Sequence, residues 1–169
     1  MGEIRGRILI VDDELAIRLT VREILRRANY DAVAVASGEE ALGLIESQSF
    51  DLALIDLVMP GTDGIELIRR LQEVAPDTVT IVLTARGSME TAIEALRLGA
   101  HDYLTKPCDE RLLKRCIETG LAKRREELHR RKLVDTLSTA ALELAGEPAT
   151  SAHAPTTPAG ERIRLGDLV

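Results

Sequence analysis

Acidic, hydroxyl and lysine side chains lie where several short apolar segments of the sequence end. Asp12 and Asp13 follow the first segment, and Asp56 follows the third. Thr84 and Lys106 lie at the ends of the last two. Three carboxylates in one place repel each other unless a cation lies among them, and hard oxygen ligands suit Mg²⁺ better than Zn²⁺. Together the five residues would support phosphoryl transfer to a carboxylate, in which a metal, an ammonium and a hydroxyl share the charge of the phosphoryl oxygens.

Five apolar segments are expected to form the strands that position these residues. They are Arg7 to Val11, Asp31 to Val35, Asp51 to Ile55, Val79 to Leu83 and Asp102 to Leu104. Runs such as ILIV and LALI are apolar without alternation, which is typical of strands that are covered on both faces. Apolar residues at helical spacing separate the strands, and a longer helix follows the last one. This order predicts an α/β domain with a doubly wound, five-stranded parallel sheet, five helices and an extended last helix.

Three of the predicted helices begin with capping signals. Ser37 with Glu40 and Asp63 with Glu66 match the capping box, in which a side chain accepts a hydrogen bond from the first turn. Asp109 is a candidate N-cap for the last helix. These signals support the proposed element order.

The carboxyl ends of parallel strands meet at one edge of a doubly wound sheet, and ligands bind there. Each candidate residue has an ordinary explanation when taken alone. Asp12 and Asp13 could cap the first helix, Lys106 could be an exposed lysine, and Thr84 could simply end a strand. Their coincidence at one sheet edge favours a common site.

Two other phosphate chemistries are disfavoured by the same loops. A nucleotide-binding sheet would carry a glycine-rich loop after its first strand, but this strand runs into Asp12-Asp13-Glu14. A haloacid-type phosphatase would carry the pattern DxDx[TV], but DLVMP lacks the second Asp. No additional nucleophile or base lies at the strand ends, so an enzyme that acts on an external substrate is not expected.

Four motifs occur in a fixed order, namely VDDE at 11–14, DLVMPGTDG at 56–64, LTA at 83–85 and YLTKP at 103–107. In order and spacing they resemble the receiver domain of response regulators, and the likeness covers residues 5–122. The resemblance implies the flavodoxin-like arrangement of that family. The segment TARGSMETAIEALRLGAHDYLTKP is most similar to receivers that precede transcriptional activators of the nitrogen-regulator type.

The resemblance implies a role for each residue of the acidic edge. Asp56 would be the phosphoacceptor, and Asp12 and Asp13 would be the acidic pair that holds Mg²⁺. Asp56 itself and the backbone carbonyl of Val58 would complete the metal ligands supplied by the chain.

The resemblance also implies how the site would report its state. Lys106 would bind the phosphoryl oxygens, and Thr84 would be the switch hydroxyl that moves toward them. Tyr103 would be the aromatic whose rotation reports that movement, although core packing is an equally good explanation for this side chain. The output face would comprise the fourth helix, the fifth strand and the fifth helix.

By the same resemblance, the chain would be the phosphorylation-activated receiver of a cytoplasmic two-component phosphorelay that regulates transcription. A sensor histidine kinase or a phosphotransfer protein would be its partner, and it would catalyse only its own phosphorylation and dephosphorylation. The alternative is a receiver-like protein-binding module that works without phosphorylation. The complete set of acidic, hydroxyl and lysine residues favours the first interpretation.

Composition excludes several other classes. The formal net charge of -6 argues against nucleic-acid or anionic-membrane binding by the whole surface, so nucleic acid is expected only through an output domain not evident here. No apolar run approaches the roughly 18 residues of a membrane span. Cys108 and Cys116 have no Cys or His partners at ligand spacing, so neither a disulfide framework nor a zinc site is expected.

The chain is expected to divide into four parts. Residues 1–122 would form the receiver domain and residues 123–145 a helical extension. Residues 146–160 are rich in Pro, Ala, Thr and Ser, which is typical of a flexible linker. Residues 161–169 would be a tail or the start of a truncated output domain.

The helical extension carries apolar residues at helical spacing, namely Leu133, Leu137, Ala141 and Leu144. This stripe suits either pairing with a second copy in a homodimer or folding back onto the chain. A homodimer through the output face is the other arrangement that the family resemblance allows.

Overall fold

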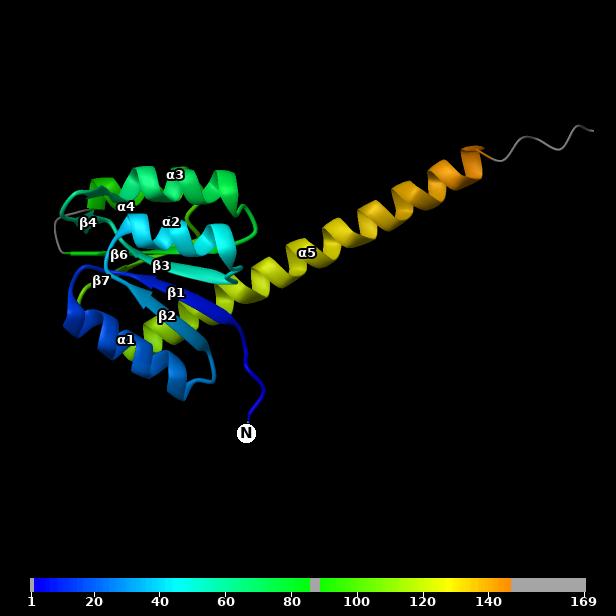
Figure 1. Cartoon of the computed structure of the whole chain (residues 1–169). Coiled ribbons are helices and arrows are strands. Elements are labelled where there is room, and N and C mark those ends of the chain that lie inside the picture. The colour runs from blue at the N-terminus through cyan, green and yellow to red at the C-terminus, as the bar shows by residue number, and fades with distance from the viewer. Residues whose placement is uncertain (1, 86–88, 147–169) are drawn as a thin grey trace, which may run out of the picture. The chain divides into compact units, whose positions relative to one another are not determined.

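A computed structural model describes residues 2–85 and 89–146 of the chain, which falls into two compact units, Met1–His129 and Arg130–Val169. The strands of the main sheet are β1 (Arg7–Val11), β2 (Asp31–Val35), β3 (Leu52–Asp56), β6 (Val79–Thr84) and β7 (Asp102–Thr105). The helices are α1 (Leu15–Arg27), α2 (Gly38–Ser47), α3 (Gly64–Val74), α4 (Met89–Arg97) and α5 (Glu110–Gly146). All five strands are parallel, in the order β2-β1-β3-β6-β7 (Figure 1). The predicted doubly wound sheet is therefore confirmed.

Helices cover both faces of this sheet in the first unit. In Figure 1, α2, α3 and α4 lie over one face, and α1 and the beginning of α5 lie over the other. Successive side chains of a strand point to opposite faces. In β1, Leu9 and Val11 therefore join one buried cluster while Ile8 and Ile10 join the other. This arrangement explains why the central strands are apolar at every position.

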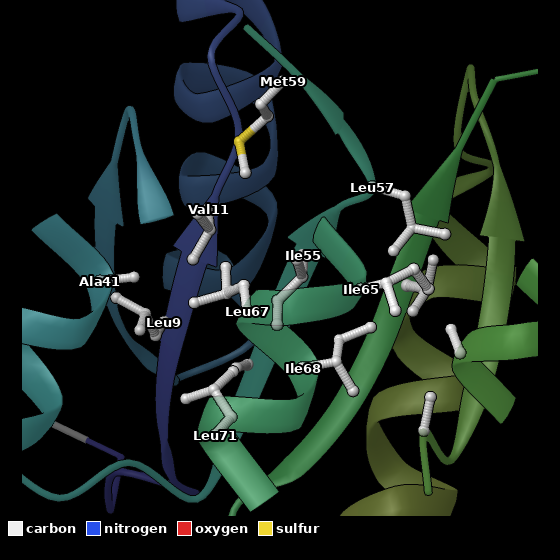
Figure 2. Close-up of a cluster of buried hydrophobic side chains, with 14 of the residues drawn as sticks. Leu9, Val11, Ala41, Ile55, Leu57, Met59, Ile65, Leu67, Ile68 and Leu71 are labelled. Atoms are coloured by element: carbon white, nitrogen blue, oxygen red, sulfur yellow. The ribbon is translucent and has the colours of Figure 1, made fainter. Parts of the chain in front are cut away.

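The cluster beneath α3 fixes that helix next to the strand that ends in Asp56. Leu67, Ile68 and Leu71 of α3 are buried and pack with Ile55 of β3 (Figure 2). Fully burying a leucine or isoleucine side chain contributes about 1.5–3 kcal/mol. Packing of this face therefore holds the position of the loop between β3 and α3.

All three predicted capping residues lie at the start of a helix and accept backbone hydrogen bonds. Ser37 Oγ accepts one from the Glu40 N–H at 3.2 Å, and Asp63 Oδ1 accepts one from the Ile65 N–H at 3.0 Å. Asp109 Oδ1 accepts one from the N–H two residues further on, also at 3.0 Å. Each bond satisfies one of the free N–H groups in the first helical turn.

A short hairpin between β3 and α3 was not predicted. Its strands are β4 (Val58–Met59) and β5 (Thr62–Asp63), which pair antiparallel around a turn with Gly61 at φ 70°. Two-residue strands are too short to show an apolar period in the sequence. The third predicted strand is also shifted by one residue, because Asp56 pairs with Leu83 and so belongs to β3.

The second unit is described only from residue 130 to residue 146, all within α5. Every one of these residues is exposed. The exposed fractions of Leu133, Val134, Leu137 and Leu144 run from 51% to 76%. The last helix is thus extended, as predicted, and ends in an apolar stripe that no described residue of its own unit covers.

The predicted tail 161–169 lies outside the described residues, and so does the predicted linker 146–160 apart from Gly146. Over residues 2–85 and 89–146, no helix is long and apolar enough to cross a membrane. The proposed boundaries of the receiver domain and its extension stay predictions.

Candidate functional site

Asp12 lies at the carboxyl end of β1 and is completely buried. Its Oδ1 accepts a hydrogen bond from the Glu14 N–H at 2.9 Å. Arg18, on the first turn of α1, donates Nη1 to the backbone carbonyl of Asp12 at 2.8 Å. These two bonds hold the loop between β1 and α1. Neither of them involves Asp12 Oδ2.

Asp56 ends the neighbouring strand β3 and is 3% exposed. Its Oδ1 accepts a hydrogen bond from the Val58 N–H at 3.0 Å. The next residue, Leu57, is approached closely by the start of α3, since a Cβ atom on Gly64 would lie 2.6 Å from the Leu57 Cα. Only glycine permits this approach, which places the hairpin beside the carboxylate.

Lys106 links the two aspartates although it comes from the far end of the domain sequence. Its Nζ lies 2.7 Å from Asp12 Oδ2 and 3.0 Å from Asp56 Oδ2. A third carboxylate oxygen, Glu14 Oε1, lies 3.3 Å from the same nitrogen. The Lys106 N–H donates to the Thr84 carbonyl at 2.8 Å, which anchors the lysine at the end of β6.

Burial raises the pKa of the Asp56 carboxyl above its ordinary value, and the Asp12 charge adds to that shift. The Val58 N–H and the Lys106 ammonium oppose it. For Lys106, burial acts to lower the pKa, but the Asp12 and Asp56 carboxylates raise it above its ordinary value. The Lys106 ammonium therefore stays charged. It does not fully offset the cost of burying the charged Asp56 carboxylate, so a bound cation would stabilise the charged form of Asp56.

Four acidic residues bring carboxylate oxygens to within 4.8 Å of one another, namely Asp12, Asp13, Glu14 and Asp56. Asp12 and Asp56 are buried, whereas Asp13 and Glu14 are exposed. The buried Asp12 Oδ2 accepts no hydrogen bond, so apart from its ion pair with Lys106 it has lone pairs to offer. An all-oxygen donor set fits a hard divalent cation such as Mg²⁺.

The structure places the remaining predicted residues around this centre. Thr84 is buried at the end of β6, and its hydroxyl donates to the Ala85 carbonyl at 3.2 Å rather than to a carboxylate. Val58 is 60% exposed at the start of the hairpin. Tyr103, on β7, is partly buried and packs against the same cluster as α3.

Two residues of the site were not singled out from the sequence. Glu14 was visible as the third acid of VDDE, but nothing in the spacing indicates that its side chain reaches Lys106. Arg18 carries no sequence signal at all, because its role is to bond a backbone carbonyl.

Comparison with known proteins agrees with the geometry. The family model described as "Response regulator receiver domain" matches residues 8–118. The response regulator protein PilR of Pseudomonas aeruginosa is 39% identical over 123 residues, which cover 73% of this chain and 28% of PilR. The phosphate regulon transcriptional regulatory protein PhoB of the same species is 43% identical over 108 residues, which cover 63% of this chain and 47% of PhoB.

Solved structures show the same fold. A CheY-like response regulator receiver domain protein from Methanospirillum hungatei matches with a TM-score of 0.69 and 35% identity, covering 72% of this chain and 97% of that one. NtrX from Brucella abortus matches with a TM-score of 0.73 and 28% identity, covering 76% of this chain and 29% of that one. The chain thus spans under a third of PilR and of NtrX.

Proposed function

This chain belongs to the response regulator receiver domain family of two-component systems, and we propose that it is a switch that accepts a phosphoryl group on Asp56. The observation that carries the proposal is the Lys106 ammonium, which lies 2.7 Å from Asp12 and 3.0 Å from Asp56 in a largely buried cluster. The donor would be a phosphohistidine on a sensor kinase or phosphotransfer protein, and the reaction would take place in the cytoplasm.

In the proposed reaction, an oxygen of the Asp56 carboxylate attacks the phosphorus atom. The new phosphorus–oxygen bond forms as the bond between phosphorus and the donor imidazole nitrogen breaks, and the imidazole leaves with the electron pair. Lys106 is already 3.0 Å from Asp56 Oδ2, so its charge is in place for the phosphoryl oxygens. The Val58 N–H keeps the carboxylate oriented through Oδ1.

The proposed metal ligands are Asp12, Asp13, Asp56 and the backbone carbonyl of Val58. A bound Mg²⁺ would supply positive charge to the phosphoryl oxygens as they are transferred. The chain prepares for it by burying Asp12 with an oxygen that accepts no hydrogen bond. Arg18 and the Glu14 N–H fix the loop that carries both aspartates of the pair.

Phosphorylation would then bias an equilibrium between two arrangements of the domain. Thr84 would exchange its bond to the Ala85 carbonyl for one to the phosphoryl group, and Tyr103 would follow by packing more deeply. The surface formed by α4, β7 and α5 would change, and an output domain or partner would respond to it. PhoB is a transcriptional regulatory protein, and transcription is therefore the proposed output of this chain as well.

We also propose that the exposed stripe of α5 pairs with a second copy of the chain. Val134 and Ala141 alternate with Leu137 and Leu144 at spacings of three and four residues, the pattern of two-stranded coiled coils. Leucine and valine side chains this exposed would gain from burial in such a pair.

Beryllofluoride, which mimics an aspartyl phosphate, gives a direct test of the switch. We expect it to bind in the presence of Mg²⁺, with shifts of the Thr84 and Tyr103 signals in NMR spectra. Asp13→Ala should weaken Mg²⁺ binding by roughly tenfold or more. If beryllofluoride does not bind at any Mg²⁺ concentration, the domain is a phosphorylation-independent binding module.

A further inference from the structure

We propose that Glu14 holds the Lys106 ammonium in the unphosphorylated protein and releases it when Asp56 is phosphorylated, which makes Glu14 a positioning residue of the site. The inference rests on the function proposed above. It concerns a residue that the predicted ligand set does not include, and it follows from how the three carboxylates share a single ammonium.

Three carboxylates share the ammonium in this arrangement, and two of them, Glu14 and Asp56, accept its hydrogen bonds. A lysine carries three N–H donors. Its Nζ lies 2.7 Å from Asp12 Oδ2, 3.0 Å from Asp56 Oδ2 and 3.3 Å from Glu14 Oε1. An incoming phosphoryl oxygen must therefore compete with these carboxylates for the ammonium.

Burial decides which carboxylate leaves. The Asp12 side chain is fully buried and that of Asp56 is 5% exposed, so neither can exchange the ammonium for water. The Glu14 side chain is 60% exposed and makes the longest of the three contacts. Water can replace the lysine at Glu14 with little loss, because exposed ion pairs contribute little.

The backbone allows the Glu14 side chain to leave without moving the rest of the site. Its N–H is held by Asp12 Oδ1 at 2.9 Å, and the residue precedes α1 as its N-cap with no side-chain capping bond of its own. Arg18 holds the same loop through the Asp12 carbonyl. Release of Lys106 is thus a side-chain rotation, and the aspartate pair stays where it is.

The glutamate also places a negative charge where an anionic donor must approach. Glu14→Gln removes that charge and most of the attraction for the ammonium while keeping the length of the side chain. We expect beryllofluoride to bind Glu14→Gln about two- to fivefold more tightly than wild type at saturating Mg²⁺, the size expected for an exposed pair.

A matched control separates the contact from general charge. Glu39 is an exposed acid in the first turn of α2, which follows the carboxyl end of β2 at the same edge of the sheet. Glu39→Gln removes the same charge without touching a residue that contacts Lys106. It should leave both the beryllofluoride affinity and the Lys106 ammonium signal close to wild type.

The experiment is ¹⁵N NMR of the Lys106 ammonium in wild type, Glu14→Gln and Glu39→Gln, each with Mg²⁺ and with or without beryllofluoride. We expect the Lys106 signal of Glu14→Gln to differ from wild type before beryllofluoride is added and to coincide with it afterwards. The Glu14 proposal would be overturned if the Lys106 signals of Glu14→Gln and wild type were identical before beryllofluoride is added, or if they still differed afterwards. It would also be overturned if Glu14→Gln bound beryllofluoride no more tightly than wild type. Wild-type protein that binds no beryllofluoride would instead overturn the proposed function, and the release of Glu14 with it.

Discussion

Lys106 Nζ lies 2.7 Å from Asp12 Oδ2, and the two side chains are 12% and 0% exposed. This ion pair joins the first strand of the domain to the loop after the last one. Because Asp56 lies 3.0 Å from the same nitrogen, one lysine balances two buried carboxylates. The pair therefore bears on stability as well as on phosphoryl transfer.

Lys106→Ala should lower the free energy of unfolding by about 3–5 kcal/mol in the absence of Mg²⁺, because it leaves two buried carboxylates without a counter-charge. Added Mg²⁺ should restore much of that loss, since it binds the folded state. Urea titrations with and without Mg²⁺ measure both effects. Lys114→Ala, which removes only an exposed pair with Glu110, is the control and should change stability by less than about 1 kcal/mol. A Lys106→Ala protein as stable as the control would contradict the proposed charge balance.

Gly64→Ala should destabilise the protein and slow phosphorylation of Asp56. The new Cβ would lie 2.6 Å from the Leu57 Cα and 2.7 Å from its carbonyl oxygen, so the backbone next to Asp56 must shift. We expect a loss of about 1–3 kcal/mol in thermal or urea unfolding.

Gly43→Ala is the matched control for that substitution. Gly43 lies inside α2, and a Cβ there would meet nothing within 4 Å. Removing a glycine from a helix interior should stabilise the protein by about 0.5–1 kcal/mol. Equal effects of the two substitutions would show that the close approach at Leu57 is not needed.

Cys116 should react with alkylating agents only at high pH. Burial, together with the Asp102 carboxylate that its Sγ contacts at 3.3 Å, raises the pKa of the thiol to about 11. The thiolate is the reactive form, so in a Cys108→Ser background the alkylation rate of the native protein should rise near pH 11. The folded state holds this proton more tightly than the unfolded state, so the thiol's contribution to stability is lost as pH rises toward 11.

Asp102→Asn supplies the check on that assignment. The variant removes the carboxylate and should lower the pKa of Cys116 part of the way toward its ordinary value, because burial of the thiol still raises it. A native protein whose Cys116 already titrates at that ordinary value would contradict the geometry of the contact.

Leu137→Asp should disrupt the proposed pairing of α5. Leu137 is 69% exposed, so the substitution costs the monomer little, but an aspartate in a coiled-coil seam should raise the dimer Kd by about tenfold or more. Sedimentation equilibrium of both proteins measures this shift. Leu142→Asp adds the same charge off the seam and should leave the dimer intact. Monomeric wild-type protein at all concentrations would exclude the pairing.

Sequence patterns sufficed for the architecture because both faces of the sheet are buried. The run ILIV must place Ile8 and Ile10 on one side and Leu9 and Val11 on the other, and both sides need apolar residues. The capping signals worked for a similar reason, since the hydrogen bond of Ser37 or Asp63 is local in the chain. Such features depend on residues that are close together in the sequence, so the sequence alone can predict them.

The features that were not predicted from the sequence depend on contacts between residues that are far apart in the chain. Glu14 and Lys106 are far apart in sequence, and the reach of the glutamate becomes visible only when both strand ends are in place. The β4–β5 hairpin is too short for a period, and the choice of Asp56 as the last residue of β3 follows from its pairing with Leu83. None of these three features can be predicted from the positions of the residues in the sequence alone.

The most direct test of the central claim is intact-mass analysis after incubation with acetyl phosphate and Mg²⁺. Wild type, Asp56→Asn and a wild-type sample with chelator would be compared. We expect one phosphoryl adduct on wild type, which is lost in the Asp56→Asn variant and lost when the metal is removed. An adduct that persists in Asp56→Asn, or that forms equally well without divalent metal, would contradict Asp56 as the acceptor in a metal-dependent switch.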